Sequence, residues 1–184
     1  LKGIIDGLTA SSYTPLANRA ITVARYYKHD GYFSAADPIQ YVCQRNFMVI
    51  MTDGRPRLEG NNSNANAVGQ FSYIESWLGA PYDKDGDGLD PDRAHFPPNV
   101  PPGCPLPGGA DMEPCEYLDG GSDYLDDICK VLVENDLRPD LDGQQALITY
   151  TIGFSEANSL LQSATAHGGG KYFTANSDDE LADA

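Results

Sequence analysis

Acidic side chains recur at alternate positions between residues 83 and 87, and a glycine follows them. Asp83, Asp85 and Asp87 fall at positions 1, 3 and 5 of a cation-binding loop, with Gly88 at position 6. In such loops the carboxylates converge on the ion. The glycine makes the turn that brings in the backbone carbonyl of position 7, which here belongs to Leu89. Because these oxygen ligands suit a hard cation, the sequence predicts a calcium site.

The end of this loop departs from the EF-hand pattern. An EF-hand has a bidentate Glu at position 12, and Ala94 stands there instead. We therefore expect Asp90 or Asp92 to complete the ligand shell of the ion from a shorter loop. Such a loop resembles the Asp-rich loops of extracellular calcium repeats. A solvated acidic turn is the alternative, although so many like charges repel one another unless a cation neutralises them. With calcium, the loop is expected to stiffen its surroundings rather than to signal.

A second candidate site combines Thr14 and Asp53. Five consecutive apolar residues, Phe47–Met51, precede an Asp-Gly turn that starts at Asp53. Such a run predicts a strand buried on both faces of a parallel sheet, and open α/β sheets bind ligands at the carboxyl ends of their strands. Thr14 precedes Pro15 at a predicted helix start. The alternative is that Asp53 opens a turn and Thr14 caps a helix.

Helical and strand periodicities alternate around these residues, which predicts an α/β fold with a parallel sheet. Thr14 and Ser122 are expected to cap helices. Residues 168–170, three glycines, are expected to stop another helix. The expected elements are a short helix at residues 1–8, a helix to about Tyr27, a strand at 47–51, helices at 71–78 and 124–135, a strand at 146–154, a helix at 158–166, a strand at 171–174, and a helix starting at Asp178.

Residues 55–121 interrupt this order. The segment is rich in Asn, Gly and Pro, and only residues 71–78 within it have an amphipathic pattern. A stretch of this length with so little periodicity usually is a functional insertion. We therefore expect one α/β domain over residues 1–184, with a long irregular insertion that carries the calcium loop.

The charge balance excludes some partners. The chain has 12 Lys and Arg against 27 Asp and Glu, a net charge of -15, so nucleic acid and anionic membranes would be repelled. No apolar run approaches the roughly 20 residues that span a bilayer. Residues 1–8 also lack the charged and apolar regions of a signal peptide. Cations are the expected ligands.

Four cysteines lack the paired spacing of a zinc site. An even number in a Gly- and Pro-rich chain fits two disulfides and an oxidising compartment, and four cysteines allow three pairings. Cys104 and Cys115 lie in one loop-like segment, so we expect them to pair, which leaves Cys43 for Cys129. Four free thiols in a cytosolic protein are the alternative.

The arrangement of Thr14 and Asp53 resembles two parts of the metal-ion-dependent adhesion site of von Willebrand factor A domains. That family has an Asp-x-Ser-x-Ser motif, then a Thr, then an Asp in a Thr-Asp-Gly turn. The last two parts match, and the first motif occurs nowhere in the chain. The resemblance implies magnesium or another divalent cation at Thr14 and Asp53. It also implies a domain incomplete at its N-terminus, whose missing part would lie upstream of Leu1. A shorter α/β domain without this site is the alternative.

A narrower resemblance runs in order along nearly the whole chain. It resembles the A-type domain of PilC/PilY-type proteins of bacterial type IV pili, whose β-propeller and its calcium site have no counterpart here. The matching segments are Thr14-Pro15-Leu16, Tyr32-Phe33, Pro38-Ile39-Gln40-Tyr41, Cys43-Gln44-Arg45-Asn46-Phe47, Met51-Thr52-Asp53-Gly54, Tyr124-Leu125-Asp126-Asp127, Thr149-Tyr150-Thr151-Ile152-Gly153-Phe154 and Gly168-Gly169-Gly170-Lys171-Tyr172-Phe173.

This resemblance implies a non-enzymatic adhesion and pilus-biogenesis module. It would be exported through the periplasm to the pilus tip or outer-membrane surface of a bacterium. Its partners would be pilins or minor pilins, a host or abiotic surface, and the missing N-terminal part of its own domain. A calcium-binding A-type scaffold or binding module of an unrelated secreted protein is the alternative. An enzyme is disfavoured, because His29, His95 and His167 are scattered over predicted loops and neither GxSxG nor HExxH occurs.

Overall fold

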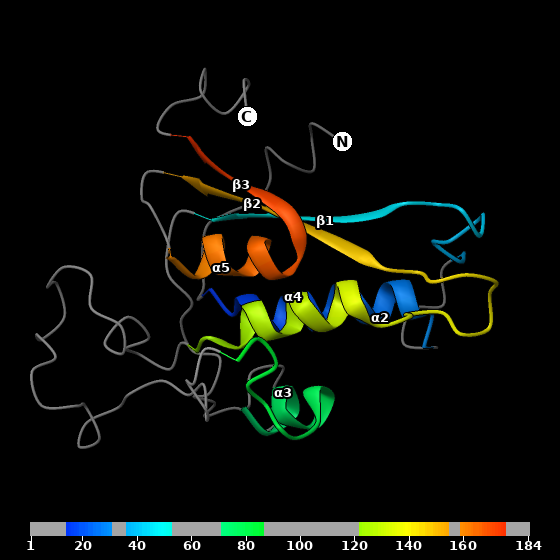
Figure 1. The fold of residues 1–184 in the computed structure, drawn as a ribbon, viewed down its shortest axis with the longest axis horizontal. Coiled ribbons are helices and arrows are strands. Elements are labelled where there is room, and N and C mark those ends of the chain that lie inside the picture. Colours follow the sequence, from blue (N-terminus) through cyan, green and yellow to red (C-terminus); the bar gives the residue numbers. More distant parts are fainter. Residues whose placement is uncertain (1–13, 31–35, 53–70, 87–121, 155–158, 176–184) are drawn as a thin grey trace, which may run out of the picture.

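The computed structural model describes residues 14–30, 36–52, 71–86, 122–154 and 159–175 (Figure 1). These ranges hold every helix and strand discussed below. Several expectations lie outside them: the helices at residues 1–8 and from Asp178, most of the 55–121 insertion, and the residues Asp53, Asp87, Leu89, Asp90, Asp92, Cys104 and Cys115.

Three parallel strands form the sheet. They are β1 (Asn46–Thr52), β2 (Leu147–Phe154) and β3 (Gly169–Ala175), in the order β1-β2-β3. The register of β1 on β2 runs without a shift from Asn46 opposite Leu147 to Thr52 opposite Gly153. The expected parallel α/β architecture is therefore confirmed for the part of the chain that the structure describes.

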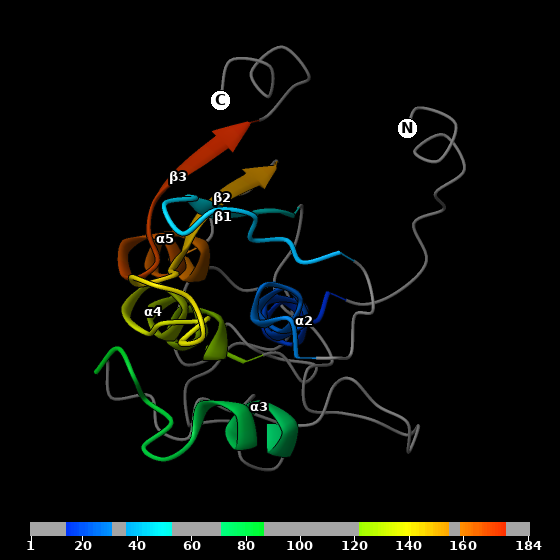
Figure 2. The ribbon, with the colours of Figure 1, turned by 90° about the vertical axis from the view of Figure 1, so that its right-hand side faces the viewer.

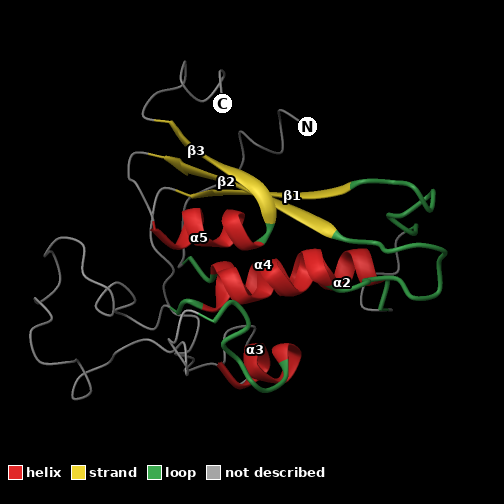
Figure 3. Cartoon of the chain, viewed as in Figure 1, coloured by secondary structure: helices red, strands yellow, loops and turns green. Residues whose placement is uncertain are grey.

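Helices cover one face of this sheet (Figure 2). They are α2 (Leu16–Lys28), α4 (Tyr124–Glu134) and α5 (Ser159–His167), and α4 contacts α2, α5 and β2. A shorter helix, α3 (Phe71–Leu78), packs against α2 and α4 on the side away from the sheet (Figure 3). None of the described helices is long and apolar enough to cross a membrane.

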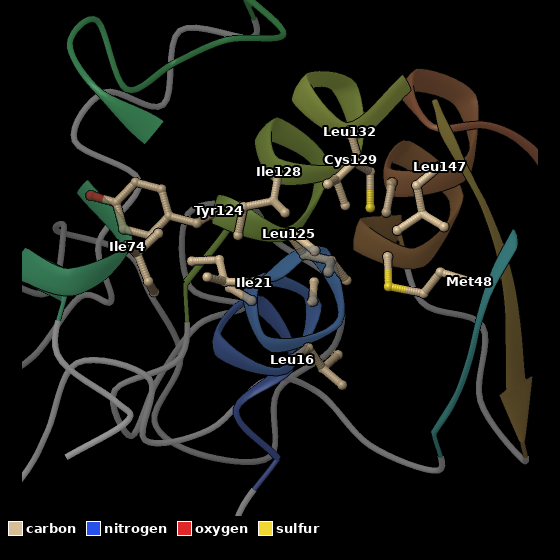
Figure 4. Close-up of a cluster of buried hydrophobic side chains, with 14 of the residues drawn as sticks. Leu16, Ile21, Met48, Ile74, Tyr124, Leu125, Ile128, Cys129, Leu132 and Leu147 are labelled. Carbon is tan, nitrogen blue, oxygen red and sulfur yellow. The ribbon is translucent and has the colours of Figure 1, made fainter. Parts of the chain in front are cut away.

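The hydrophobic core lies between the sheet and these helices (Figure 4). Ile21 of α2, Ile128 of α4 and Ile74 of α3 are fully buried. Each such side chain contributes about 1.5–3 kcal/mol to stability through its removal from water. Tyr124 is also fully buried, and its hydroxyl donates to Oε1 of Glu75 at 3.0 Å, which links α4 to α3.

The glycine run does more than end a helix. Gly168 follows α5, but Gly169 and Gly170 already belong to β3. A Cβ on Gly170 would lie 1.9 Å from the carbonyl oxygen of Thr149, so only glycine fits where β3 meets β2. Gly169 has φ 72°, which favours glycine as well. The strand therefore begins earlier than the expected Lys171.

Three local expectations are wrong. The strand β1 is buried on one face only, because its residues alternate between buried and exposed, and Phe47, Val49 and Met51 are exposed. Helix α2 starts after Pro15, and α4 starts after Asp123, each without a side-chain capping hydrogen bond. Thr14 contributes its backbone instead, since its carbonyl accepts from the N–H of Leu16 at 3.0 Å.

Candidate metal centre

The first half of the acidic loop follows α3 and forms a turn of its own. The N–H of Gly86 donates to Oδ1 of Asp83 at 2.6 Å. Gly86 has φ 85°, a conformation that residues with a Cβ rarely adopt. The alternation of Asp and Gly in this stretch therefore bends the backbone back toward its own carboxylates, as a cation-binding loop requires.

Two buried carboxylates of α4 meet this turn. Asp126 and Asp127 in the first turn of the helix are 2% and 1% exposed. Oδ1 of Asp127 accepts from the N–H of Asp85 at 3.2 Å and also from the N–H of Lys84. The acidic loop is thus held against α4 by main-chain hydrogen bonds to one side chain.

Two groups of side chains could each hold a metal ion, and Asp85 belongs to both. One group contains Asp83, Asp85 and Asp127, and the other contains Asp85, Asp126 and His167. Within each group, one potential ligand atom from every residue lies within 4.8 Å of the others. The side chain of Asp85 is 2% exposed, so a cation there would be removed from bulk water. The arrangement can hold a metal ion between the insertion and the domain core.

His167 reaches the centre from the last residue of α5. Its Nδ1 lies 3.2 Å from Oδ2 of Asp85 and 3.3 Å from Oγ of Ser163. Both contacts involve the same ring nitrogen. A Ser-His-Asp hydrolase uses the two different nitrogens to pass a proton, so this arrangement does not match a catalytic triad. It matches a histidine that supports or joins a ligand shell.

The buried carboxylates interact strongly with one another. Burial, followed by the charge of Asp123, raises the pKa of Asp126 to about 10, while a hydrogen bond with Ser163 lowers it and the charges of Asp85 and Asp127 add to the rise. Removal from water therefore favours the neutral form of the Asp126 carboxyl when no cation is bound. A divalent cation would invert this balance, because it favours ionised ligands.

Sequence reasoning missed Asp126, Asp127 and His167 as site residues. It placed the closure of the calcium shell on Asp90 or Asp92, which lie outside the described residues together with Asp87 and Leu89. The available signal was the pair Asp126-Asp127 between Leu125 and Ile128 in a helix that otherwise buries apolar residues on that side. Two adjacent acidic residues on the buried side of a helix need hydrogen-bond donors or a cation as partners.

The other predicted site is placed only in part. Thr14 is half-buried two residues before the start of α2, and Thr52 at the end of β1 is buried. Asp53 lies outside the described residues, so the distance between the two predicted ligands is not defined.

The predicted disulfide between Cys43 and Cys129 is not formed. Cys43 is an exposed free thiol in the turn before β1, whereas Cys129 is a free thiol buried on α4. Burial raises the pKa of the Cys129 thiol to about 12, and Cys129 is fully buried within the hydrophobic core. The structure thus places the two thiols in different environments, one exposed and one buried.

Comparisons with protein-family models, with curated proteins and with solved structures gave no match. The geometry of the acidic loop and the resemblance of the sequence motifs are therefore the evidence for function.

Proposed function

We propose that this chain is a non-enzymatic binding module whose fold is stabilised by calcium. One observation carries the proposal: Asp83 and Asp85 of the calcium-like loop converge with the buried Asp127 of α4. Calcium takes six to eight oxygen ligands, and the carboxylates of two separate segments supply several of them. The ion would then join the insertion to the helical layer.

The resemblance of the sequence segments to PilC/PilY-type A domains extends the proposal to a biological role. The chain would serve in adhesion and type IV pilus biogenesis at the pilus tip or outer surface of a bacterium. Its partners would be pilins or minor pilins, a host or abiotic surface, and an upstream part of the same A-like domain. Magnesium or another divalent cation at Thr14 and Asp53 belongs to the same proposal, and its support is the motif resemblance together with the position of Thr14 next to Pro15, the residue before α2.

The second candidate function is a calcium-binding scaffold or binding module of an unrelated secreted protein. The same metal geometry favours it, because that geometry does not depend on a pilus. The two roles differ in their partners. Purified pilin should bind to the immobilised chain in calcium if the pilus role is correct, and should not bind in the scaffold role.

The metal is tested by thermal unfolding and isothermal titration calorimetry of the full chain. A ligand that binds only the native state stabilises it by about 2.7 kcal/mol at a hundredfold excess over the dissociation constant. We expect calcium to raise the melting temperature and Asp85→Asn, which alters both ligand groups, to remove the gain. Asp142→Asn is the matched control, because Asp142 is exposed in the loop between α4 and β2.

Parallel titrations with magnesium, manganese and zinc identify the ion. Binding of zinc without a response to calcium would contradict the calcium assignment and would give His167 the leading role, since imidazole suits zinc. An unchanged melting temperature with every cation would leave the acidic loop as a solvated turn and end the metal proposal.

A further inference from the structure

Exposed apolar side chains are concentrated on and just before β1. Six large hydrophobic residues among the described ones are exposed, and only Tyr26 lies elsewhere. On β1 the exposed fractions are 45% for Phe47, 64% for Val49 and 59% for Met51. We call the five residues the β1 strip: Tyr41, Val42, Phe47, Val49 and Met51.

The β1 strip continues onto the face of the sheet that the described helices leave open. Phe47, Val49 and Met51 stand opposite Ile148, Tyr150 and Ile152 of β2, which are half-buried. The rings of Phe47 and Tyr150 contact each other with centroids 6.0 Å apart. Helices α2, α4 and α5 lie on the opposite face (Figure 2). A parallel sheet is normally covered on both faces, so this surface is suited to contact with another protein.

The edge of β1 is also suited to pairing. Within the described ranges its only neighbouring strand is β2. The strand has seven residues without a charge or a proline, and its register on β2 contains no bulge. Soluble proteins usually protect an edge strand with charges, prolines or bulges, and β1 has none of these.

We propose that β1 accepts an added β-strand from a separate polypeptide with apolar side chains at alternate positions and Lys or Arg at its ends. Main-chain hydrogen bonds along the edge would supply affinity, and the alternate side chains would cover the β1 strip. The net charge of -15 attracts a basic segment and opposes the approach of a second copy of this chain. The inference does not depend on the metal centre.

The test is a selection of random peptides displayed on phage against the full chain, with counter-selection on Val49→Lys. Val49 is exposed, so this variant should keep the melting temperature of the parent; if it does not, Met51→Lys replaces it. Gln162→Lys is the matched control, because it adds the same charge at an exposed position of α5. Synthetic copies of the selected peptides are then titrated by fluorescence anisotropy.

We expect selected peptides to alternate apolar residues between basic ends. Val49→Lys should weaken their binding at least about tenfold, which corresponds to about 1.4 kcal/mol, and Gln162→Lys should change it little. A proline in the centre of the peptide should abolish binding, because proline cannot donate to the strand ladder.

Three results would overturn the proposal. The first is a selection that yields no peptide with stronger binding to the parent than to Val49→Lys. The second is an equal loss with both lysine variants, which would indicate attraction by charge alone. The third is that the parent self-associates in analytical sedimentation and Val49→Lys does not. That result would show that the β1 strip binds a second copy of this chain.

Discussion

The main-chain N–H of Asp85 donates to Oδ1 of Asp127 at 3.2 Å, across 42 positions of sequence. This hydrogen bond places a carboxylate from the turn after α3 beside the buried carboxylates of α4. The position of the candidate metal centre therefore depends on Asp127 in two ways, as an acceptor for the loop backbone and as a charge for a cation.

Two substitutions of Asp127 separate these roles. Asp127→Asn keeps an acceptor and removes the charge, whereas Asp127→Ala removes both. Without a cation we expect the Ala variant to be about 1–3 kcal/mol less stable than the Asn variant, because the amides of Lys84 and Asp85 lose their acceptor. Both variants should lose the response to calcium. Urea unfolding with calcium and with a chelator measures this, and a full calcium response in Asp127→Ala, which has no ligand atom, would exclude Asp127 as a ligand.

The ion pair of Asp37 with Arg138 predicts a dependence of stability on pH. Nη1 of Arg138 lies 2.7 Å from Oδ1 of Asp37, and this hydrogen bond is the main reason why the pKa of Asp37 falls from 3.8 to about 2. A lowered folded-state pKa contributes stability above pH 3.8 that is lost as pH falls toward 2.

Urea unfolding of the parent and of Asp37→Asn across this range checks the prediction. The difference in unfolding free energy should be constant near pH 5 and should shrink between about pH 4 and pH 2. Asp142→Asn is the matched control, because it removes one exposed carboxylate that takes no part in this ion pair. A difference between parent and Asp37→Asn that persists at pH 2 would show that the pair does not titrate as described.

The two described cysteines should differ in reactivity. Cys43 is exposed, while Cys129 is buried and its thiol has a pKa raised to about 12 by burial. Because the thiolate is the reactive form, iodoacetamide at mildly alkaline pH should modify Cys43 in the native protein and Cys129 only after unfolding. Peptide mapping by mass spectrometry distinguishes the sites. A Cys43–Cys129 cross-linked peptide in the non-reduced digest would contradict the structure.

Two glycines provide a graded test of the fold. Gly170→Ala would place a Cβ 1.9 Å from the Thr149 carbonyl, so we expect a loss of more than about 3 kcal/mol or failure to fold. Gly143→Ala meets no atom within 4 Å but has φ 78°, and it should cost about 1–2 kcal/mol. Denaturant unfolding ranks them. Equal stabilities of the two variants would be inconsistent with the close approach of β3 to β2.

Periodicity predicted most elements because each helix has a distinct apolar face. The predicted helix at residues 71–78 is confirmed as α3, and the predicted strand at 146–154 differs from β2 by one residue. The strand at Phe47–Met51 was placed correctly but given two buried faces. Val49 and Met51 are apolar and exposed, and the sequence of one strand contains no information about whether a helix covers its outer side.

The candidate site was predicted less completely because its parts come from distant segments. The spacing of Asp83 and Asp85 indicated a cation-binding loop from local sequence alone. Asp126 and Asp127 fit equally well as acidic residues that favour a helix N-terminus, so nothing local connected them with the loop. Their role depends on how α3 and α4 pack, and short-range patterns do not determine that packing. The pairing of Cys43 with Cys129 was inferred by elimination along the sequence, which likewise contains no information about packing, and the Cys104–Cys115 pairing stays a prediction.

The hydrogen bond from Asp85 to Asp127 also brings the two ends of the intervening segment together. The free energy needed to close a loop grows slowly with its length, by about 0.6 kcal/mol for each doubling. A module with this design can exchange, lengthen or shorten the segment between these residues during evolution while its sheet and helices stay unchanged. New binding specificity could thus be acquired without a new fold.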